Sequence, residues 1–553
     1  MVDKRNVCAA RRLPRARKTG CRVALVSDMA EQQAIVLVRP VAALAARPRL
    51  FAALEAAFPV RFQAEPTADG SLAGVLAVGH ADLPSSADLA AVGLPTLAVY
   101  GEAVATTERE ELRLAGAPGV DRRLRGVALG DRLAAPPLEP APGDEVLAEA
   151  DSGPAWTLAA GPTPVHRVRA ALPELGADEP LYTLLSQHAL ASVALIHFLR
   201  ALCEGAGHRP PPLRATIHFD DPNLRWRSYG FIDYRALLAH ADAHGYHVAM
   251  AMIPLDAGRA DRATAALFAR RPDRLSLVFH GNDHVKGELM APRDAATARA
   301  LAAQAVRRME RFERRSGLRV DRVMTPPHGM CSQAMVRALG EVGFDALAAI
   351  YPLPWTDRYP AEPVLAGWWP AEWVSGCAVI PRIPMQSSVA DIAMRAFLDH
   401  PIVLYGHHED LAGGLEPLAR AAEAVNRLGD VHWTSMGEIA RTNCELRTNG
   451  ERIVVRPFAR RLALPVDGGR AVCVEAPSEA LGDGSLVGWT CNGGAVRPFG
   501  SELAPLGGGD ADVRLIGARD LNGRAVPAPA WRPWPKLRRL ATEARDRLMP
   551  LRG

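Results

Sequence analysis

Four short polar clusters in the middle of the chain contain the residue types that metal-dependent hydrolysis needs. They are residues 220–223 (Asp-Asp-Pro-Asn), 280–284 (His-Gly-Asn-Asp-His), 325–329 (Thr-Pro-Pro-His-Gly) and 406–410 (Gly-His-His-Glu-Asp). Each cluster comes directly after a short apolar run that predicts a strand. In (β/α) barrels the carboxyl ends of the strands meet at one rim, where active sites lie. We therefore expect the four clusters to form one site.

Two histidines, His280 and His284, are the first candidates for metal ligands. They are four residues apart, so that one helical turn would place both rings on the same side. Two imidazoles and one carboxylate suit zinc, iron, cobalt or nickel, and they leave positions open for water and substrate. The spacing alone is weak, because His240 and His244 have the same spacing at the end of a predicted helix. The position after a strand, near two aspartates, favours a metal site for His280 and His284.

The two adjacent aspartates, Asp220 and Asp221, allow a division of labour. One carboxylate would bind the metal, and its neighbour would take a proton from metal-bound water. The alternative is that both acids are solvated, or that Asp221 caps a turn before Pro222. Beside the histidine pair, the catalytic interpretation is the stronger one.

At these residues the chain resembles the polysaccharide deacetylases of the NodB-type homology group, also called carbohydrate esterase family four. The family motif Thr/Ser-Phe-Asp-Asp is similar to residues 218–221 (His-Phe-Asp-Asp), and its motif His-Ser/Thr-x-x-His is similar to residues 280–284. Its Arg-x-Pro-x-Gly motif corresponds to residues 325–329, and its final Leu-x-His motif resembles residues 404–407 (Leu-Tyr-Gly-His). The resemblance covers residues 213–441 and implies a distorted (β/α) barrel.

The resemblance also implies roles for individual residues. The implied metal ligands are Asp221, His280 and His284. Asp220 would be the general base, and His407 would be the acid that protonates the leaving amine, with His408 as the neighbouring candidate. The backbone N–H near His328 would stabilise the oxyanion together with the metal. Zinc is the metal that we expect, with cobalt, nickel or iron as alternatives.

The chain departs from the family in two motifs. Thr325 stands where the family has an arginine that helps to orient the catalytic aspartate. Arg382 is our candidate for its replacement, and the alternative is an ordinary arginine of the surface or rim. No segment clearly matches the family's tryptophan-and-aspartate motif. Trp368, Trp369 and Trp373 lie in the corresponding part of the chain, where they would either line a sugar site or belong to the core.

The expected function is metal-dependent hydrolysis of an acetyl or similar acyl group on a sugar or polysaccharide. A glycoside hydrolase on a related barrel is the second possibility, and it needs two facing carboxylates. One would come from the aspartate pair and the other would be Glu288 or Glu409, but this chemistry leaves the histidines without a role. The third possibility is a carbohydrate-binding or scaffold protein that has lost turnover, which the substitution at Thr325 favours.

The whole chain predicts a multidomain α/β protein around this barrel. Residues 1–30 are basic and lack an apolar period, which predicts a disordered tail. In residues 31–205, apolar runs alternate with helical segments and predict a small parallel α/β domain. This domain lacks a glycine-rich phosphate turn, so we expect it to bind no nucleotide. Residues 445–525 predict a small β-sandwich, and residues 526–553 a basic tail.

The composition is that of a soluble globular protein, with 48% hydrophobic and 23% charged residues and a net charge of +4. Because most of the basic excess lies at the two ends, we expect no nucleic-acid groove. The eight cysteines are scattered without a Cys-x-x-Cys pair, which predicts free thiols in a reducing compartment. No apolar segment is long enough to span a membrane, and residues 23–27 are too short for a signal-peptide core. We therefore expect a cytoplasmic protein.

Overall fold

The computed structural model describes residues 33–66, 72–79, 89, 92–101, 109–133, 136–177, 179–204, 208–350, 365–466, 469–477, 484–505 and 509–551. The predicted disordered tail, residues 1–30, lies outside them. All elements below belong to one compact unit, Ala34–Gly553. None of its described helices is long and apolar enough to cross a membrane. The cysteines within the described ranges are free thiols.

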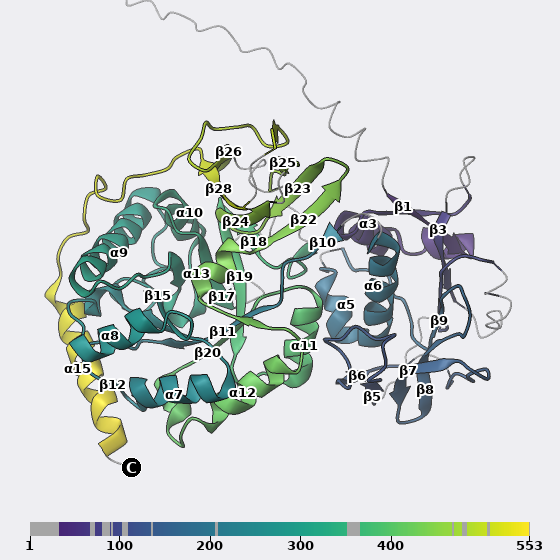
Figure 1. Cartoon of the computed structure of the whole chain (residues 1–553), viewed down its shortest axis with the longest axis horizontal. Coiled ribbons are helices and arrows are strands. Elements are labelled where there is room, and N and C mark those ends of the chain that lie inside the picture. Colours follow the sequence, from purple (N-terminus) through teal and green to yellow (C-terminus); the bar gives the residue numbers. More distant parts are fainter. Residues whose placement is uncertain are drawn as a thin grey trace, which may run out of the picture. The chain divides into compact units, whose positions relative to one another are not determined.

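The first sheet is mixed rather than parallel (Figure 1). In sheet order its strands are β2 (Val60–Gln63), β1 (Ala34–Arg39), β3 (Leu72–Val78), β4 (Thr96–Val99), β9 (Val165–Val168), β8 (Gly153–Leu158), β7 (Glu145–Ala150), β5 (Glu110–Leu114) and β6 (Ala128–Asp131). The pairs from β2 to β9 are parallel, and the pairs from β9 to β6 are antiparallel. The predicted all-parallel domain is therefore wrong for half of the sheet. The reason is local, because β7 and β8 are joined by Asp151 and Ser152 alone, and so short a hairpin connects only antiparallel strands.

Among the described residues of this region, four helices accompany the sheet. They are α2 (Val41–Ala45), α3 (Pro48–Ala57), α5 (Tyr182–Gln187) and α6 (Ala189–Cys203). Helices α5 and α6 are separated at His188, whose φ of −136° and ψ of 59° are not helical.

The second sheet closes into a barrel of seven parallel strands. In ring order they are β11 (Arg214–Asp220), β14 (Val248–Met252), β15 (Leu275–His280), β16 (Val323–Thr325), β17 (Ala346–Ile350), β19 (Cys377–Pro384) and β20 (Ile402–Gly406). The ring is closed because β14 and β20 both pair with β11. Strand β14 is buried along its whole length, as parallel strands with two covered faces are. The predicted (β/α) barrel is confirmed.

Helices and two short strands surround the ring. The helices are α7 (Tyr234–His244), α8 (Arg262–Arg270), α9 (Ala295–Ser316), α10 (Gln333–Glu341), α11 (Val389–Phe397), α12 (Glu416–Asn426) and α13 (Met436–Arg441). Strand β21 (His432–Trp433) pairs with β11, and β18 (Glu372–Val374) pairs with β19. Asp233, Asp261 and Asp294 cap α7, α8 and α9 by accepting backbone N–H hydrogen bonds.

After the barrel the chain forms two small sheets that share an apolar core. One sheet has the order β10 (His208–Arg209), β22 (Cys444–Asn449), β23 (Arg452–Pro457), β25 (Ala471–Val474) and β27 (Glu502–Leu503). The other has the order β24 (Arg461–Val466), β28 (Gly509–Gly517) and β26 (Leu486–Cys491). Val455 of β23, Leu462 of β24 and Val513 of β28 belong to the same buried cluster, so the two small sheets share one core. The all-β character of this region agrees with the sequence.

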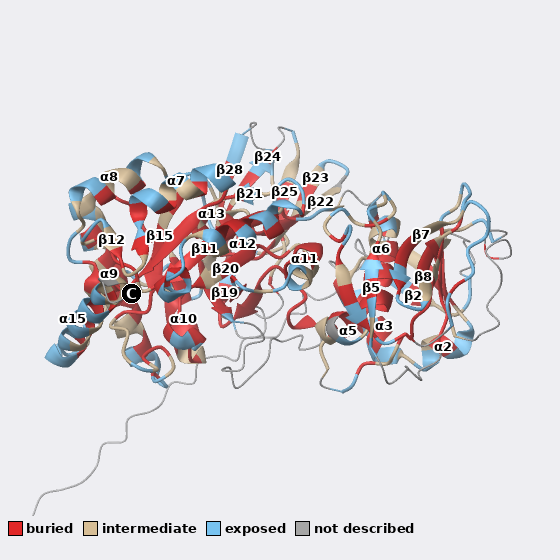
Figure 2. Cartoon of the chain, turned by 90° about the horizontal axis from the view of Figure 1, so that it is seen from below, coloured by how far each residue is buried: buried red, intermediate tan, exposed pale blue. Residues whose placement is uncertain are grey.

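The end of the chain differs from the predicted basic tail. Residues 533–548 form a helix, α15 (Pro533–Leu548), which Figure 1 shows in yellow beside α8 and β12 (Ser228–Tyr229). Its Arg539, Glu543 and Asp546 are buried, whereas other positions of the helix are exposed (Figure 2). The sequence pattern did not predict packing, because the buried side chains of this helix other than Pro535 are charged.

Candidate metal centre

The barrel brings Asp221, His280 and His284 together at the carboxyl ends of its strands. Asp221 follows β11 and His280 ends β15, and one ligand atom of each residue lies within 4.8 Å of the others. His284 Nε2 is 3.3 Å from Asp221 Oδ1. This oxygen is buried and accepts no hydrogen bond from the described residues. A carboxylate oxygen that accepts no hydrogen bond, beside two imidazoles, fits a divalent cation, and the structure brings the three predicted ligands together.

Both imidazoles are prepared to ligate as neutral rings. Burial lowers the pKa of His280 to about 4 and that of His284 to about 3. His280 Nδ1 lies 3.0 Å from the Thr325 carbonyl oxygen and 3.1 Å from its Oγ1. An N–H at Nδ1 therefore donates to Thr325 and leaves Nε2 free for a metal. Thr325, which replaces the family arginine in sequence, thus orients a ligand.

The segment from His280 to His284 is a loop and not the helical turn that the spacing suggested. Gly281 and His284 have left-handed φ angles of 62° and 54°. The buried carboxylate of Glu288 holds this loop by accepting three backbone N–H hydrogen bonds. The donors are Asn282, Asp283 and His284, at 2.7, 2.8 and 2.9 Å. A Cβ at Gly281 would lie 2.2 Å from Glu288 Oε1, so the close approach of Glu288 requires glycine there.

Asp220 is buried beside the ligands and is held as a carboxylate. Arg382 Nη1 donates to its Oδ2 at 3.0 Å and to its Oδ1 at 3.2 Å. Burial alone would raise the pKa of Asp220, but the charges of Arg382 and His280 and the contact with His218 hold it well below its usual value. Arg382 is 2% exposed and is therefore not the surface arginine of the alternative prediction. It comes from β19 and contacts the aspartate that the family arginine orients.

His218 is a functional neighbour that the sequence analysis did not single out. It is fully buried, its Nδ1 is 3.4 Å from Asp220 Oδ1, and its Nε2 is 3.4 Å from Arg382 Nη1. The signal was present, because His218 occupies the first position of the aspartate motif. Together His218 and Arg382 fix the direction in which the Asp220 carboxylate faces.

The predicted catalytic residues His328 and His407 lie at the same rim and are exposed. The His328 ring is 5.5 Å from the His284 ring, and its backbone φ is 60°. His407 follows Gly406, which pairs with Phe219 of β11, so it lies on the Asp220 side of the site. The neighbouring candidate, His408, is buried instead. Its Nε2 lies 3.8 Å from Asp546 Oδ2, so it faces α15.

The three tryptophans proposed as a sugar site are used by the core. Trp368 and Trp373 are 6% and 7% exposed, and Trp373 Nε1 donates to the Pro457 carbonyl oxygen at 2.9 Å. Trp369 stacks on Phe458 with ring centroids 5.9 Å apart. Of the two interpretations of these tryptophans, the core is therefore the correct one: Trp369 and Trp373 pack between the barrel and the small sheets, and the Trp368 ring lies 5.9 Å from the Phe58 ring.

Two arginines of α15 complete the surroundings of the ligands. Arg539 Nη1 lies 3.6 Å from Asp221 Oδ1, and its Nη2 lies 2.9 Å from Asp256 Oδ2. Arg538 Nη2 lies 3.4 Å from His284 Nδ1. The sequence offered no signal for these contacts, because Arg538 and His284 are 254 residues apart. Arg539 is shared between a candidate ligand and a second buried carboxylate.

No protein-family model and no curated protein matches the sequence. Among solved structures, Agd3, a novel carbohydrate deacetylase, is similar at 11% identity and a TM-score of 0.47, over 88% of this chain and 98% of that chain. A family 4 carbohydrate esterase from Streptomyces lividans in complex with acetate has 13% identity and a TM-score of 0.23, over 39% and 86%. A CE4 family pseudoenzyme from Bacillus anthracis has 10% identity and a TM-score of 0.24, over 40% and 64%.

Proposed function

We propose that this chain is a metal-dependent hydrolase that removes an acetyl or similar acyl group from a sugar or polysaccharide. The observation that carries the proposal is the convergence of Asp221, His280 and His284 beside a buried carboxylate, Asp220, that is not one of them. Zinc suits this donor set, with cobalt, nickel or iron as alternatives. When bound, such a cation lowers the pKa of its water and polarises the substrate carbonyl.

The surrounding side chains perform the proton transfers. Asp220 accepts a proton from the attacking water, and Arg382 keeps Asp220 ionised and correctly directed. Transfer to a positioned base is worth about a hundred- to ten-thousand-fold in rate. His407, exposed at the rim, protonates the leaving amine. The backbone N–H near His328 donates to the oxyanion.

Two neighbouring substitutions test this division of labour. In Asp221→Asn a neutral oxygen replaces an anionic donor, so we expect the metal to be lost. In Asp220→Asn we expect the metal to be retained. In both variants we expect the release of acetate from chitooligosaccharides and acetylated sugars to fall. Equal metal content in both variants and in the unaltered protein would remove Asp221 from the site. Full activity of Asp220→Asn would show that Asp220 is not the general base.

The contacts of three residues weaken the two alternative functions. Glu288, a candidate acid for a glycoside hydrolase, is already bound by three backbone N–H groups, and Glu409 is exposed beside His408. The case for a protein without turnover rested on Thr325, but Arg382 contacts Asp220 in the place of the family arginine. Metal content and acetate release separate these alternatives from the proposal.

A further inference from the structure

Helix α15 has both of its acidic side chains and Arg539 inside, and its large apolar side chains outside. Five of the thirteen exposed large apolar side chains in the described part of the chain belong to residues 531–548. They are Trp531 (77% exposed), Trp534 (68%), Leu537 (58%), Leu540 (47%) and Leu548 (48%). A surface helix of a globular protein normally has the opposite pattern, with its apolar stripe toward the core. The apolar side of α15 is therefore available to a partner.

Paired charges fix this orientation of the helix. Glu543 Oε2 is 2.6 Å from Arg225 Nη1, and the Tyr229 hydroxyl donates to Asp546 Oδ2 at 2.8 Å. Arg539 is paired with Asp256. A rotation that buried the leucines would leave these barrel charges without partners, which is costly in the interior. The apolar side of α15 thus faces outward because the inner side is held by ion pairs.

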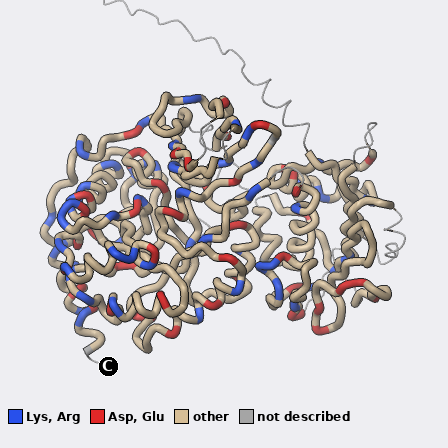
Figure 3. Tube along the Cα trace, viewed as in Figure 1, with Lys and Arg blue, Asp and Glu red and all other residues tan. Residues whose placement is uncertain are grey.

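The exposed charges of this region are all of one sign. Both acids of residues 531–548, Glu543 and Asp546, are at most 5% exposed, whereas Arg532 and Lys536 are exposed. Figure 3 marks the charged residues along this helix, which leads to the C-terminus. The members of this surface, called the outer face of α15 below, are Trp531, Arg532, Trp534, Lys536, Leu537 and Leu540.

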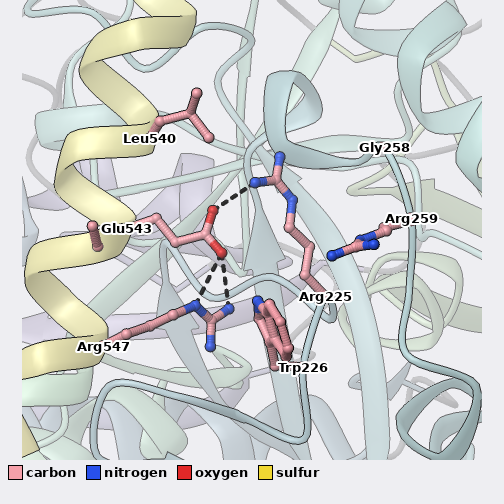
Figure 4. A pocket seen from close by; sticks show the side chains of 8 residues that line it. Arg225, Trp226, Gly258, Arg259, Leu540, Glu543 and Arg547 are labelled. Carbon is pink, nitrogen blue, oxygen red and sulfur yellow. Dashed lines mark hydrogen bonds and ion pairs between the residues drawn. The ribbon is translucent and has the colours of Figure 1, made fainter.

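A cationic pocket adjoins the outer face at Leu540 (Figure 4). It has a volume of about 480 Å³, and its lining includes Arg225, Trp226, Arg259 and Arg547 together with a single acid, Glu543. Trp226 is 54% exposed, and the Arg259 guanidinium lies 5.7 Å from its ring centroid. Glu543 is already bonded to Arg225 and Arg547, so the pocket keeps a positive excess that suits a phosphate group.

We propose that the outer face of α15 docks the protein on an anionic phospholipid bilayer, with a lipid phosphate in the pocket. Tryptophan favours the bilayer interface, leucine inserts into the apolar layer below it, and basic residues are attracted by acidic headgroups. A second copy of the chain would bring cations against cations, which disfavours self-docking. An acidic soluble polymer would match the cations but would leave the leucines in water.

The docked orientation indicates a substrate class, an inference that rests on the proposed function. The same helix contacts the candidate ligands, through Arg539 beside Asp221 and Arg538 beside His284. Docking through the outer face of α15 therefore places the candidate metal centre on the bilayer side of the barrel, behind this helix. The substrate class that fits this arrangement is an acylated sugar attached to, or held close to, the membrane.

Vesicle flotation of the full chain tests the docking without any measurement of activity. We expect binding to vesicles of phosphatidylcholine with phosphatidylglycerol, weakening as salt is added, and little binding to phosphatidylcholine alone. A double variant, Trp534→Ser with Leu537→Ser, should bind the anionic vesicles at least about tenfold more weakly, because two inserting side chains are lost. The matched control is Val487→Ser with Val496→Ser, which alters side chains that are 54% and 56% exposed outside α15. It should bind like the unaltered protein.

Several results would overturn the docking proposal. One is equal vesicle binding by both double variants, and another is failure of the unaltered protein to bind anionic vesicles. If the protein forms a concentration-dependent dimer that the α15 substitutions abolish, the face binds a second copy of the chain. If the protein is retained on a soluble acidic polysaccharide in a salt-sensitive way and does not bind vesicles, the face binds a polymer. Circular dichroism and metal content of each variant report on folding. Loss of acetate release with vesicle binding intact would count only against the proposed function.

Discussion

Two histidine pairs in this chain have the same spacing and different surroundings. His280 and His284 have ring centroids 4.9 Å apart and share a site with a carboxylate. His240 and His244, on the last turns of α7, have ring centroids only 4.3 Å apart, and His240 Nδ1 lies 2.8 Å from the Tyr246 hydroxyl. Among the described residues, no carboxylate completes a ligand group with the helical pair. The closer pair is therefore the one without a site.

The difference lies in what other parts of the chain deliver to each pair. A helix alone places two side chains with this spacing on one face, where they meet solvent. The pair at the barrel rim needs Gly281 and Glu288 to shape its loop and β11 to supply Asp221. Local helix geometry is thus enough to bring two histidine rings together, whereas a complete ligand set needs the barrel to add a carboxylate.

The largest expected effect separates the two pairs directly. His284→Asn removes a ligand at a position whose left-handed backbone asparagine tolerates, so we expect metal affinity to fall by more than about 100-fold, with loss of acetate release. His244→Asn makes the same change in the helical pair and should leave both properties unchanged. A competitive zinc titration measures the affinities. A similar loss in both variants would contradict the assignment of the rim pair as ligands.

The next effect concerns the base and not the ligands. Arg382→Ala removes the cation that directs Asp220, and we expect the rate of acetate release to fall by about 10- to 100-fold while metal is retained. The control is Arg271→Ala, which removes an ion pair with Asp242 of α7 and should leave acetate release and metal content unchanged. Partial recovery in Arg382→Lys would support a role of charge. Unchanged turnover in Arg382→Ala would show that Asp220 needs no arginine.

A smaller effect is expected at the loop that shapes the rim pair. Glu288→Gln keeps the size of the side chain but weakens acceptance from the three backbone N–H groups, so the His284 ring is held less firmly. We expect metal affinity to decrease by about tenfold, within the range for groups that support ligands. Zinc titration and thermal unfolding with and without chelator measure this effect. If Glu288→Gln binds zinc with the same affinity as the unaltered protein, Glu288 does not support the ligand loop.

The smallest effect belongs to the helical pair. Tyr246→Phe removes the hydroxyl that contacts His240, and we expect the free energy of unfolding to decrease by about 1 kcal/mol. Metal affinity and acetate release should not change. Chemical denaturation gives the stability difference, and a measurable change in metal binding would mean that the two histidine pairs are coupled.

The sequence predicted the candidate ligands well because the relevant signals are local. An apolar run that ends in a polar cluster marks the carboxyl end of a strand, and barrel closure brings such ends to one rim. The histidine pair and the aspartate pair were identified in this way, although the helical turn expected for the histidines is a loop. The assignment of Asp221 as a ligand and of Asp220 as the general base came from the family resemblance.

Other features depend on contacts that no local pattern records. Arg382 was only a candidate until the barrel placed it against Asp220, 162 residues away in the sequence. The antiparallel half of the first sheet was missed because strand direction depends on the connections between strands, which the apolar runs do not show. The tryptophans near residue 370 gave no decision between sugar site and core, since an aromatic side chain serves both.

The sequence by itself determined the (β/α) barrel type, the polar clusters at its strand ends and the residue types available for chemistry. Those depend on apolar periodicity and on motifs that are contiguous in the chain. Only the tertiary structure decided the role of α15, which supplies Arg539 to the candidate metal centre and turns Trp534 and Leu537 outward. The physical reason is that hydrophobic patterning predicts burial only where burial is driven by apolar surface, and α15 is held to the barrel by paired charges.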